Sequence, residues 1–396
     1  MLSSGSLVLA LAGSQALAAR LFVASYTGEV STLSLDEDAH GTYSLKVIAS
    51  TMACAANASW ITLDHQRDTL FCADRGLVAK NGTLNSLKIQ KDGSLVALDR
   101  SQTPVGAAAT TMYANNTALA VAYFSSSSVG SFDISSASKI RALQHFEHSM
   151  ATPGPNAQLQ SAPHPHHAIT DPTDSYVLVP DLGADLVRVY RIDHATRLLE
   201  PLAPFTTPTG SGPRHGSWLV TRSHTYFYLV GQLANTLTGY EVTYNSDKTL
   251  SFERKFVKSL LETTTPGVTL QFWSAAAGIV VSPDNKFLLV SQRNDTHFSI
   301  PNPSSPSSAT KIPSDSLLTY SLDQSNGKAS LISIDAAGGS FARQFSINKA
   351  GDLVAVGLQN DGRVAILKRD VKTGKNLEIV AGIDLKGQIV CMVWDE

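Results

Sequence analysis

The sequence predicts an all-β protein folded as one seven-bladed β-propeller. A unit of short strands and turns recurs along the chain, and its copies begin near Ala19, Asp64, Tyr113, Asp171, Ser223, Ser282 and Asn348. The copies are spaced about fifty to sixty-five residues apart, which suits a four-stranded propeller blade. Convincing amphipathic helical stretches are absent. A two-sheet sandwich would not explain this repeat.

Each copy shows the residue preferences of strands and tight turns. The stretch DPTDSYVLVPDLGADLVRVYRID, from Asp171, is interpreted as a turn, a strand over Tyr176–Val179, a second turn and a strand over Leu186–Ile192. Val, Leu, Ile and Tyr fill the strands, while Asp, Asn, Gly and Ser separate them. We expect the N-terminal strand and the C-terminal QIVCMVWDE to share one blade and close the ring.

The first eighteen residues are predicted to be a secretory signal peptide, which leaves 19–396 as a single propeller domain. An apolar run over Leu7–Ala12 leads to the small residues of Ala16–Ala18, as at a cleavage site. No Lys or Arg precedes the run, so a buried first strand or helix is the alternative. The run is shorter than the roughly twenty residues of a membrane span. We therefore expect a secreted protein and no membrane association.

Sequons and cysteines are also relevant to the predicted secretion of the protein. Asn-x-Ser/Thr sequons occur at Asn57, Asn81, Asn115 and Asn294, and in a secreted eukaryotic protein they are candidate glycan sites. The three cysteines are Cys54, Cys72 and Cys391. A Cys54–Cys72 disulfide and the burial of three separate thiols are both compatible with this sparse set.

Composition narrows the class of partner. The chain has 396 residues, of which 43% are hydrophobic and 16% are charged, so it has ample material for a large core. Its 33 acidic and 31 basic residues give a formal net charge of −2. A near-neutral chain without a basic stripe has little electrostatic reason to bind nucleic acid. A small-molecule ligand is the favoured partner.

Strand geometry predicts which polar residues share a face of the disc. In each blade the innermost strand begins, and the next strand ends, on the same face, because the two strands are antiparallel. This places one set together: His166, Asp181, Arg214, His215, Gln232, Arg293 and Arg343. Arginines around a channel mouth form a receptor for carboxylate or phosphate. The sequence therefore predicts an anion site at this mouth.

The histidine cluster in SAPHPHHAITDP raises the question of a metal. On a strand, His164 and His166 face one side and His167 the other, so three ligands do not converge and no metal is predicted. His167 is expected to pack between strands. His166, placed at the start of the strand HAIT, is the acid–base candidate. A structural role remains the alternative for His166.

Other members of the set also have structural alternatives. Asp181 is a candidate to cap the turn DLGAD, and His215 is a candidate to pack beside Arg214. Arg343 is a candidate for an ion pair between blades. The Ser/Pro-rich stretch His297–Ser316 follows a strand on the same face and is interpreted as either a lid or a disordered loop.

Several motifs together resemble the lactonase family of seven-bladed propellers. They are PHPHHAITDPTDSYVLVPDLGADLVRVY, GPRH, SPDNKFLLVSQRND and NKAGDLVAVGLQNDGRVAI. That family includes 6-phosphogluconolactonase and the fungal carboxy-muconate lactonizing enzyme, and the secreted form of this chain is similar to a fungal branch. The resemblance implies that His166 transfers protons, that Arg214 and Arg293 hold substrate oxyanions, and that no cofactor takes part.

The chain departs from the family at two proton-transferring positions. Gln232 stands where the family often has Glu, and Gly278 stands where strand A often opens with AAE. Gln and Gly do not exchange a proton near neutral pH. The expected function is a secreted lactonase-like propeller that acts on or binds a small lactone or carboxylate, by hydrolysis or by muconate-type lactonization. The alternatives are a catalytically lapsed binding protein and a propeller that binds macromolecules. The substrate and the oligomeric state stay open.

Overall fold

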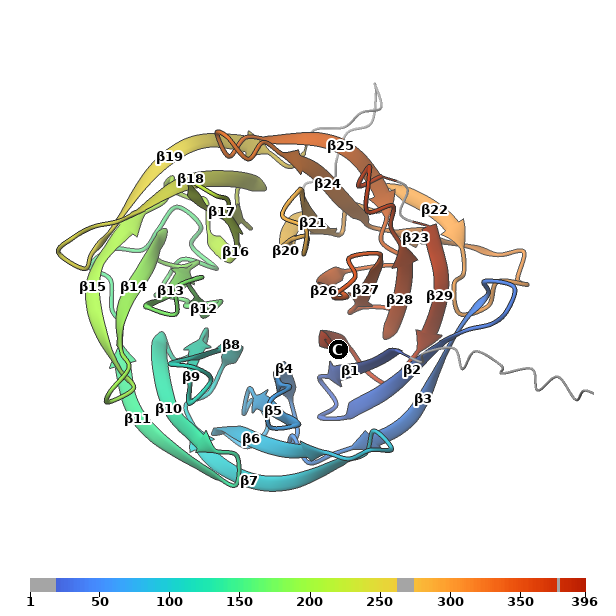
Figure 1. The fold of residues 1–396 in the computed structure, drawn as a ribbon, viewed down its shortest axis with the longest axis horizontal. Coiled ribbons are helices and arrows are strands. Elements are labelled where there is room, and N and C mark those ends of the chain that lie inside the picture. Colours follow the sequence, from blue (N-terminus) through green and yellow to red (C-terminus); the bar gives the residue numbers. More distant parts are fainter. Residues whose placement is uncertain (1–18, 262–273, 376–377) are drawn as a thin grey trace, which may run out of the picture.

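The computed structural model describes residues 19–261, 274–375 and 378–396, so the predicted signal peptide lies outside the described residues. The described residues form strands and no helix. Seven four-stranded antiparallel sheets are arranged in a ring around a central axis, as Figure 1 shows, and an additional two-stranded hairpin lies at the rim. The prediction of a seven-bladed β-propeller is confirmed.

The blades follow one another in chain order, and the first-named strand of each blade lines the channel. Blade 1 consists of β30 (Ile389–Asp395), β1 (Ala19–Ser25), β2 (Val30–Glu37) and β3 (Tyr43–Thr51). Blade 2 consists of β4 (Ala58–Asp64), β5 (Thr69–Asp74), β6 (Gly82–Ile89) and β7 (Leu95–Thr103). Blade 3 consists of β8 (Ala107–Tyr113), β9 (Ala118–Tyr123), β10 (Ser128–Ser136) and β11 (Lys139–Glu147).

The second half of the ring repeats the arrangement. Blade 4 consists of β12 (Ile169–Thr170), β13 (Tyr176–Asp181), β14 (Leu186–Asp193) and β15 (Leu198–Thr206). Blade 5 consists of β16 (Pro213–Val220), β17 (Thr225–Gly231), β18 (Thr236–Tyr244) and β19 (Leu250–Ser259). Blade 6 consists of β20 (Ala275–Val281), β21 (Phe287–Arg293), β24 (Ser316–Leu322) and β25 (Ala329–Ala336). Blade 7 consists of β26 (Ala342–Ile347), β27 (Leu353–Leu358), β28 (Arg363–Lys368) and β29 (Glu378–Asp384).

The ring is closed by a blade that contains both ends of the propeller. The C-terminal strand β30 pairs antiparallel with β1, with Arg20 opposite Asp395 and Ala24 opposite Cys391. An ion pair of 2.5 Å between Arg20 and Asp395 reinforces this closure. The expectation that QIVCMVWDE and the N-terminal strand share a blade is correct.

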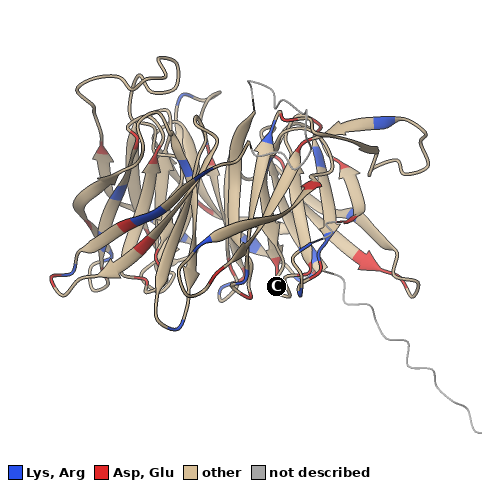
Figure 2. Ribbon diagram, turned by 90° about the horizontal axis from the view of Figure 1, so that it is seen from above, with Lys and Arg blue, Asp and Glu red and all other residues tan. Residues whose placement is uncertain are grey.

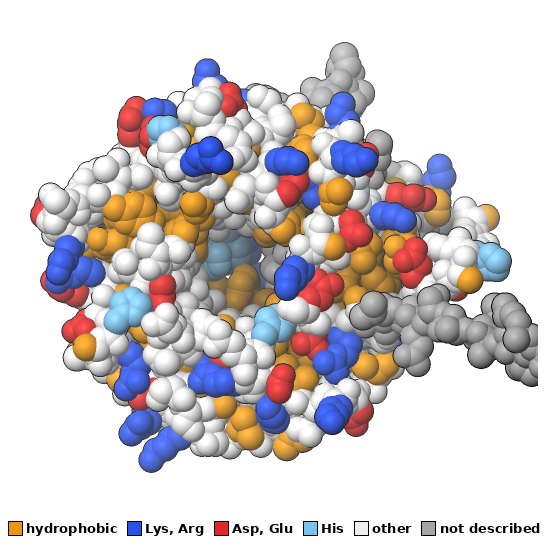
Figure 3. Space-filling model, in the orientation of Figure 1, with side chains coloured by type: hydrophobic (Ala, Val, Ile, Leu, Met, Phe, Trp, Pro, Cys, Tyr) orange, Lys and Arg blue, Asp and Glu red, His pale blue; other side chains and the backbone are white. Residues whose placement is uncertain are grey.

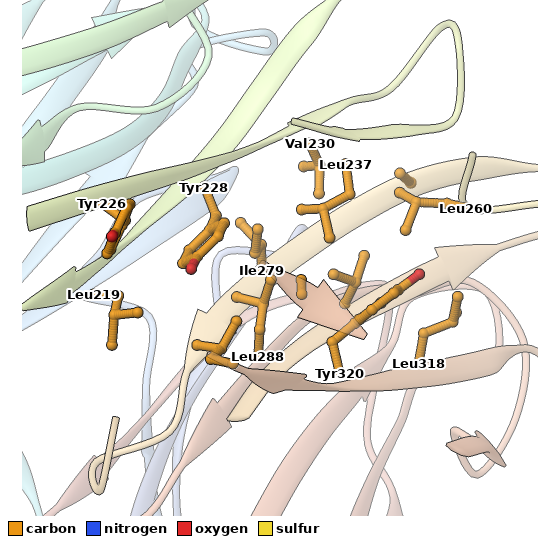
Figure 4. Packing of buried hydrophobic residues seen from close by; sticks show 14 residues of the cluster. Leu219, Tyr226, Tyr228, Val230, Leu237, Leu260, Ile279, Leu288, Leu318 and Tyr320 are labelled. Atoms are coloured by element: carbon orange, nitrogen blue, oxygen red, sulfur yellow. The ribbon is translucent and has the colours of Figure 1, made fainter. Parts of the chain in front are cut away.

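Apolar side chains between neighbouring blades hold the ring together. Figure 4 shows the cluster between blades 5 and 6, in which Tyr228 and Val230 of β17 face Leu288 of β21 and Leu318 of β24. Burying one such side chain stabilises the fold by about 1.5–3 kcal/mol relative to exposing it. Charged residues are distributed over the loops and outer strands of the disc (Figure 2).

A one-residue bulge near the start of each innermost strand shapes the channel. In blade 5, Pro213 pairs with Gly231 and His215 with Val230, which leaves Arg214 as the extra residue. Equivalent shifts occur in the other blades. In blade 4 the predicted strand HAIT begins only at Ile169, because the chain pairs at Pro165 and then bulges. A bulge re-aims side chains, and here it does so at the mouth of the channel.

The insertion in blade 6 forms neither a lid nor a disordered loop. It folds into a hairpin of β22 (Phe298–Pro301) and β23 (Lys311–Ser314). Figure 1 shows this hairpin at the outer rim beside β29. Its turn is anchored to blade 7, because Ser304 Oγ donates to Asp384 (2.7 Å) and accepts from Arg363 Nε (2.9 Å). The hairpin extends blade 7 sideways and leaves the channel uncovered.

The structure decides between a Cys54–Cys72 disulfide and three separate thiols. Cys54, in the loop between β3 and β4, forms a disulfide with Cys72 of β5, and Cys391 is a buried free thiol. No helix that is long and apolar enough to cross a membrane occurs in the described part of the chain.

Candidate site at the channel mouth

One face of the disc collects the residues that directly follow the second strand of each blade. Polar or aromatic residues that share one backbone contact stand at five of these positions: Tyr26, Arg75, Phe124, Gln232 and Gln359. The backbone N–H of each donates to the carbonyl just before an innermost strand, at 2.8–3.0 Å. The repeated bond fixes the five residues at equivalent heights, beside the bulges that carry Arg214 and Arg343. Figure 3 shows a hollow at the centre of the disc, with histidine and hydrophobic side chains on its wall.

Arg214 is the most deeply buried cation of this mouth, with 1% of its surface exposed. Its Nη1 donates to the backbone carbonyl of Ala277 in blade 6 (2.7 Å), while its buried Nε has no partner in the described structure. Burial, followed by the charges of Arg293 and Arg343, lowers the pKa of Arg214 well below its usual value. A guanidinium nevertheless stays charged in proteins. The fold therefore holds a cation here at a cost that an anionic ligand would relieve.

Arg293 ends β21 and lies above the innermost strand of the same blade. Nε donates to the carbonyl of Ala275 (3.3 Å) and Nη2 to that of Ala276 (3.4 Å). The guanidinium carbon lies 5.1 Å from the ring centroid of Phe341. Burial and the charge of Arg343 lower the pKa of Arg293 to about 9, against the opposing charge of Asp315. Arg293 is a cation at neutral pH.

Tyr26 lies between two further guanidinium groups, those of Arg75 and Arg343. Arg75 Nη1 donates to the Tyr26 hydroxyl (2.7 Å), and the guanidinium carbons of Arg75 and Arg343 each lie 5.5 Å from the centroid of the tyrosine ring. Arg343 also donates to Gln359 Oε1 (3.3 Å). Sequence reasoning missed Tyr26 and Arg75. Both occupy the position of Gln232 in other blades, so applying the strand register to every blade identifies them.

The four arginines of the mouth, Arg75, Arg214, Arg293 and Arg343, share one property. None of them lies within 4.0 Å of a carboxylate in an ion pair of the described residues, although other arginines of the chain do. The alternative of an inter-blade ion pair for Arg343 is therefore not realised. Arg214 and Arg293 are buried, and Arg75 and Arg343 are half-buried. A group of guanidinium ions without carboxylate partners is a receptor for carboxylate, phosphate or a developing oxyanion.

Histidines form the wall beside these cations. The ring of His215 lies 5.1 Å from that of His166 and is stacked at 4.3 Å on that of His167. His167 Nδ1 accepts weakly from the Gly216 N–H (3.5 Å), as expected of a residue packed between strands. His164 turns away, stacks on Phe124 and contacts its carbonyl.

His166, His167 and His215 are neutral at physiological pH. Burial comes first and the charges of Arg214, Arg343 and Arg293 follow in holding the pKa of His166 well below 6.5. Burial and the charge of Arg214 lower the pKa of His167 to about 3. His166 Nδ1 and His215 Nε2 are buried without a hydrogen-bond partner in the described structure. A neutral imidazole carries one nitrogen lone pair that can accept a proton. Burial and the surrounding cations make His166 a weak base, and an anionic ligand bound among these cations would strengthen it. Across the described residues, no three His, Cys, Asp or Glu side chains are grouped as metal ligands.

Asp181 has the contacts of the turn-capping alternative. Its buried carboxylate accepts two bonds from Arg188 (2.9 and 2.7 Å) and one each from the N–H groups of His164 (2.6 Å) and Ala184 (3.1 Å). Asp74, at the same position of blade 2, accepts from the Asn57 N–H in the same way (2.7 Å). These contacts favour the structural, turn-capping alternative, and the catalytic role of Asp181 stays a prediction.

The two positions that lack the family carboxylate differ in their surroundings. Gln232 is half-buried and follows β17 at the mouth, so its side chain reaches the face that the sequence predicted. Gly278 lies within β20, and its N–H donates to Ser291 Oγ (2.9 Å). A Cβ at Gly278 would lie 3.0 Å from the ring of the buried Phe345, which leaves little room for a longer side chain.

A cavity with a mixed polar and apolar lining continues the channel on the other side of the histidines. It has a volume of about 460 Å³ and is lined by later residues of the innermost strands, among them Trp60, Thr110, Gln344 and Met392. The Trp60 ring contacts both His167 and His215 at 5.6 Å. The histidine cluster therefore lies between this cavity and the arginines.

Two of the sequons are exposed and two are not. Asn81 and Asn115 are exposed, whereas Asn57 and Asn294 are half-buried. Asn57 Nδ2 donates to the backbone carbonyl of Tyr26 (3.0 Å), and a glycan on this nitrogen would leave it one N–H to donate. The Asn294 N–H donates to Asp315 (3.0 Å).

Comparison with known proteins identifies relatives of the whole chain. A family described as "Lactonase, 7-bladed beta-propeller" matches residues 20–394. The chain is 27% identical over 375 residues to a protein of Arthroderma benhamiae named "Probable 6-phosphogluconolactonase", covering 94% of this chain and 88% of that one. It is 25% identical over 260 residues to a 6-phosphogluconolactonase of Formosa agariphila, covering 65% of each chain.

Among solved structures, the periplasmic gluconolactonase of Pseudomonas aeruginosa superimposes with a TM-score of 0.78. The superposition covers 95% of this chain and 99% of that one at 22% sequence identity. At this identity the likeness concerns the fold.

Proposed function

The chain belongs to the lactonase family of seven-bladed β-propellers, and on that premise we propose that it opens the ring of a small lactone that carries an anionic group. The observation that carries this proposal is the set of four mouth arginines that have no carboxylate ion-pair partner among the described residues. Their charges favour a ligand that brings negative charge with it. They also favour a reaction in which more negative charge develops.

The proposed reaction is a hydrolysis of the lactone ester. Water attacks the lactone carbonyl carbon while the free nitrogen of neutral His166 accepts a proton from it. Arg214 and Arg293 stabilise the oxyanion that forms on the former carbonyl oxygen. The bond between this carbon and the ring oxygen then breaks, and the ring oxygen takes up a proton. The product is an open-chain hydroxycarboxylate.

The class of substrate is an anionic lactone of monosaccharide size. The relatives of Arthroderma benhamiae and Formosa agariphila are named for 6-phosphogluconolactone, which combines a lactone ring with a phosphate. We further propose that this chain works outside the cytosol. The leader-like residues 1–18 support this proposal, as does the Cys54–Cys72 disulfide, since disulfides persist in oxidising compartments. An extracellular sugar or aromatic acid lactone is then the physiological candidate.

The deciding experiment compares two lactones that share a ring and differ in charge. Hydrolysis of 6-phosphogluconolactone and of uncharged gluconolactone is measured with the purified protein, with Arg214→Gln and with Arg293→Gln. We expect the wild-type protein to prefer the phosphorylated substrate and each variant to lose about tenfold or more in kcat/KM, as befits a charge-assisted contact. Arg141→Gln, at a side chain that is 60% exposed, is the matched control. Equal rates for all proteins would refute the arginine clamp.

A second candidate function is binding without turnover, and Gln232 and Gly278 favour it. Both positions lack the carboxylate that the family often carries, while the arginines remain. Calorimetry with 6-phosphogluconate, the open-chain product, separates the two functions. Binding that Arg214→Gln removes, without hydrolysis of any lactone, would establish a binding protein. Ring closure of a muconate-like diacid uses the same clamp and belongs in the same substrate panel.

A further inference from the structure

The phenol of Tyr26 lies between two of the mouth arginines, Arg75 and Arg343. It follows β1, and Arg75 donates to its hydroxyl oxygen at 2.7 Å. The guanidinium groups of Arg75 and Arg343 each lie over its ring at 5.5 Å. Its backbone is fixed as well, because its N–H donates to the Gln388 carbonyl (2.9 Å) and its carbonyl accepts from Asn57 Nδ2 (3.0 Å).

The hydrogen-bond pattern leaves the proton of Tyr26 available. Because Arg75 Nη1 donates to the hydroxyl oxygen, the phenolic hydrogen must point to a different acceptor. No hydrogen bond of the described residues has the Tyr26 hydroxyl as its donor. A half-buried hydroxyl held from one side and free to donate on the other is a donor prepared for a ligand.

The surrounding charges also change the acidity of this group. Burial alone would raise the pKa of Tyr26, but the charges of Arg343 and Arg75, the hydrogen bond from Arg75 and the charge of Arg214 together lower it below 10. Tyr113 and Tyr240 behave in the opposite way, since burial raises the pKa of each to about 12. The cations thus single out Tyr26 as an acidic phenol.

The other acids near the mouth are already engaged. The Asp315 carboxylate accepts from the N–H groups of Asn294, Thr296 and Phe341. Burial raises the pKa of Asp295 to about 7, but its carboxyl group is held by the Ser316 N–H and by the Asp315 side chain.

Gln232 and Gly278 carry no acid, and the Asp181 carboxylate is occupied by Arg188 and by backbone N–H groups. His166 is neutral and receives a proton in the proposed reaction. That reaction still needs a group that gives a proton to the ring oxygen as its bond to carbon breaks.

We propose that Tyr26 is this proton donor, a catalytic residue that takes the place of the missing carboxylates. The inference rests on the proposed lactone hydrolysis. As the carbon–oxygen bond breaks, its electron pair stays on the ring oxygen, which receives the Tyr26 proton. Arg75 and Arg343 stabilise the phenolate that remains. His166 releases the proton it took from water to solvent, Tyr26 regains one from solvent, and the cycle closes with one water consumed.

A spectroscopic titration tests the acidity without any substrate. Ionisation of tyrosine is followed by the near-ultraviolet absorbance of tyrosinate in the wild-type protein, in Tyr26→Phe, in Arg75→Gln and in the control Tyr113→Phe. In the wild-type titration, we expect the ionisation step at lowest pH to belong to Tyr26. This step should be absent in Tyr26→Phe, present in Tyr113→Phe and moved to higher pH in Arg75→Gln. A wild-type curve that Tyr26→Phe leaves unchanged at its low-pH end would overturn the inference.

Turnover then tests the role in catalysis. Tyr26→Phe keeps the ring between its two guanidinium groups, so we expect KM to stay near the wild-type value while kcat falls about a hundredfold. The alkaline limb of the pH–rate profile should disappear with it. Full kcat in Tyr26→Phe would overturn the inference and leave the arginine clamp intact. If the wild-type protein binds the product but hydrolyses no lactone, the inference is also overturned. If the wild-type protein neither binds the product nor hydrolyses a lactone, the proposed function itself is rejected.

Discussion

The Arg214 guanidinium in blade 5 donates a hydrogen bond of 2.7 Å to the backbone carbonyl of Ala277 in blade 6. This buried cation is therefore held across a blade boundary by a neutral acceptor, and no carboxylate of the described residues forms an ion pair with it. Arg188 provides the contrast, since its guanidinium binds the fully buried Asp181 through two hydrogen bonds. Arg188 is thus an ion-paired cation that stabilises the fold, whereas the charge of Arg214 remains available to a ligand.

This contrast predicts opposite effects on stability. Arg214→Met removes an uncompensated buried charge, so we expect the free energy of unfolding to rise by about 1 kcal/mol while ligand binding is lost. Arg188→Met strands the Asp181 carboxylate, and we expect it to lower that free energy by about 3–5 kcal/mol. Urea denaturation of both variants measures the difference. A large loss of stability in Arg214→Met would show that its bond to Ala277 is structural.

The neutral histidines predict a loss of stability in mild acid. His166, His167 and His215 have folded-state pKa values below 6.5, so below that pH the unfolded chain binds more protons than the folded one. Above pH 6.5 these groups leave the free energy of unfolding unchanged. That free energy decreases progressively as the pH falls from 6.5 toward the folded-state pKa values, which for His167 is about 3. Each group contributes a slope of up to about 1.4 kcal/mol per pH unit.

Urea denaturation at a series of pH values measures that slope. His167→Gln should show a shallower decline between pH 6.5 and its folded pKa than the wild-type protein does. His40→Gln, at an exposed histidine in the loop after β2, is the control and should follow the wild-type curve. Parallel curves for His167→Gln and the wild-type protein would contradict neutral burial.

The repeat pattern sufficed for the ring, because strands and turns are local features. Asp181 and Arg214 show where such reasoning stops. Both were placed on the correct face by strand order, yet only the folded structure reveals that Arg188, seven residues after Asp181, occupies its carboxylate. Arg75 and Tyr26 are 49 residues apart in the sequence and belong to two neighbouring blades. Periodicity carries no information on side-chain contacts between residues this far apart.

The hairpin in blade 6 illustrates a different limit. Its Ser/Pro-rich composition is typical of an irregular loop, and its position after β21 suggested a lid. The contacts that fix it come from blade 7, through Asp384 and Arg363, about 60 to 80 residues further along the chain. Composition reports on local preference, whereas the packing partner decides where such a segment rests.

The two departures from the family pattern should respond differently to restoration. Gln232 is half-buried at the mouth, so Gln232→Glu adds a carboxylate without repacking, and we expect it to raise kcat for lactone hydrolysis. In Gly278→Glu the Cβ meets the Phe345 ring at 3.0 Å and Ser291 Oγ at 3.1 Å, so we expect a loss of about 1–3 kcal/mol in stability. Thermal unfolding and lactone kinetics of both variants check this. Equal stability of Gly278→Glu and the wild-type protein would show that Phe345 yields.

The Cys54–Cys72 disulfide predicts a coupling between redox state and the mouth. The two cysteines are separated by 18 residues, and a loop of this size limits the unfolded chain enough to stabilise the fold by about 3 kcal/mol. The bridge also anchors the loop that carries Asn57, whose side chain holds the Tyr26 carbonyl at 3.0 Å. Cys54→Ser combined with Cys72→Ser should therefore lower stability and weaken the effect of Arg75 on Tyr26. Urea denaturation and the tyrosinate titration measure these two effects, with Cys391→Ser as the control that keeps the bridge. An unchanged midpoint in the double variant, with and without reductant, would show that the loop is held by its packing alone.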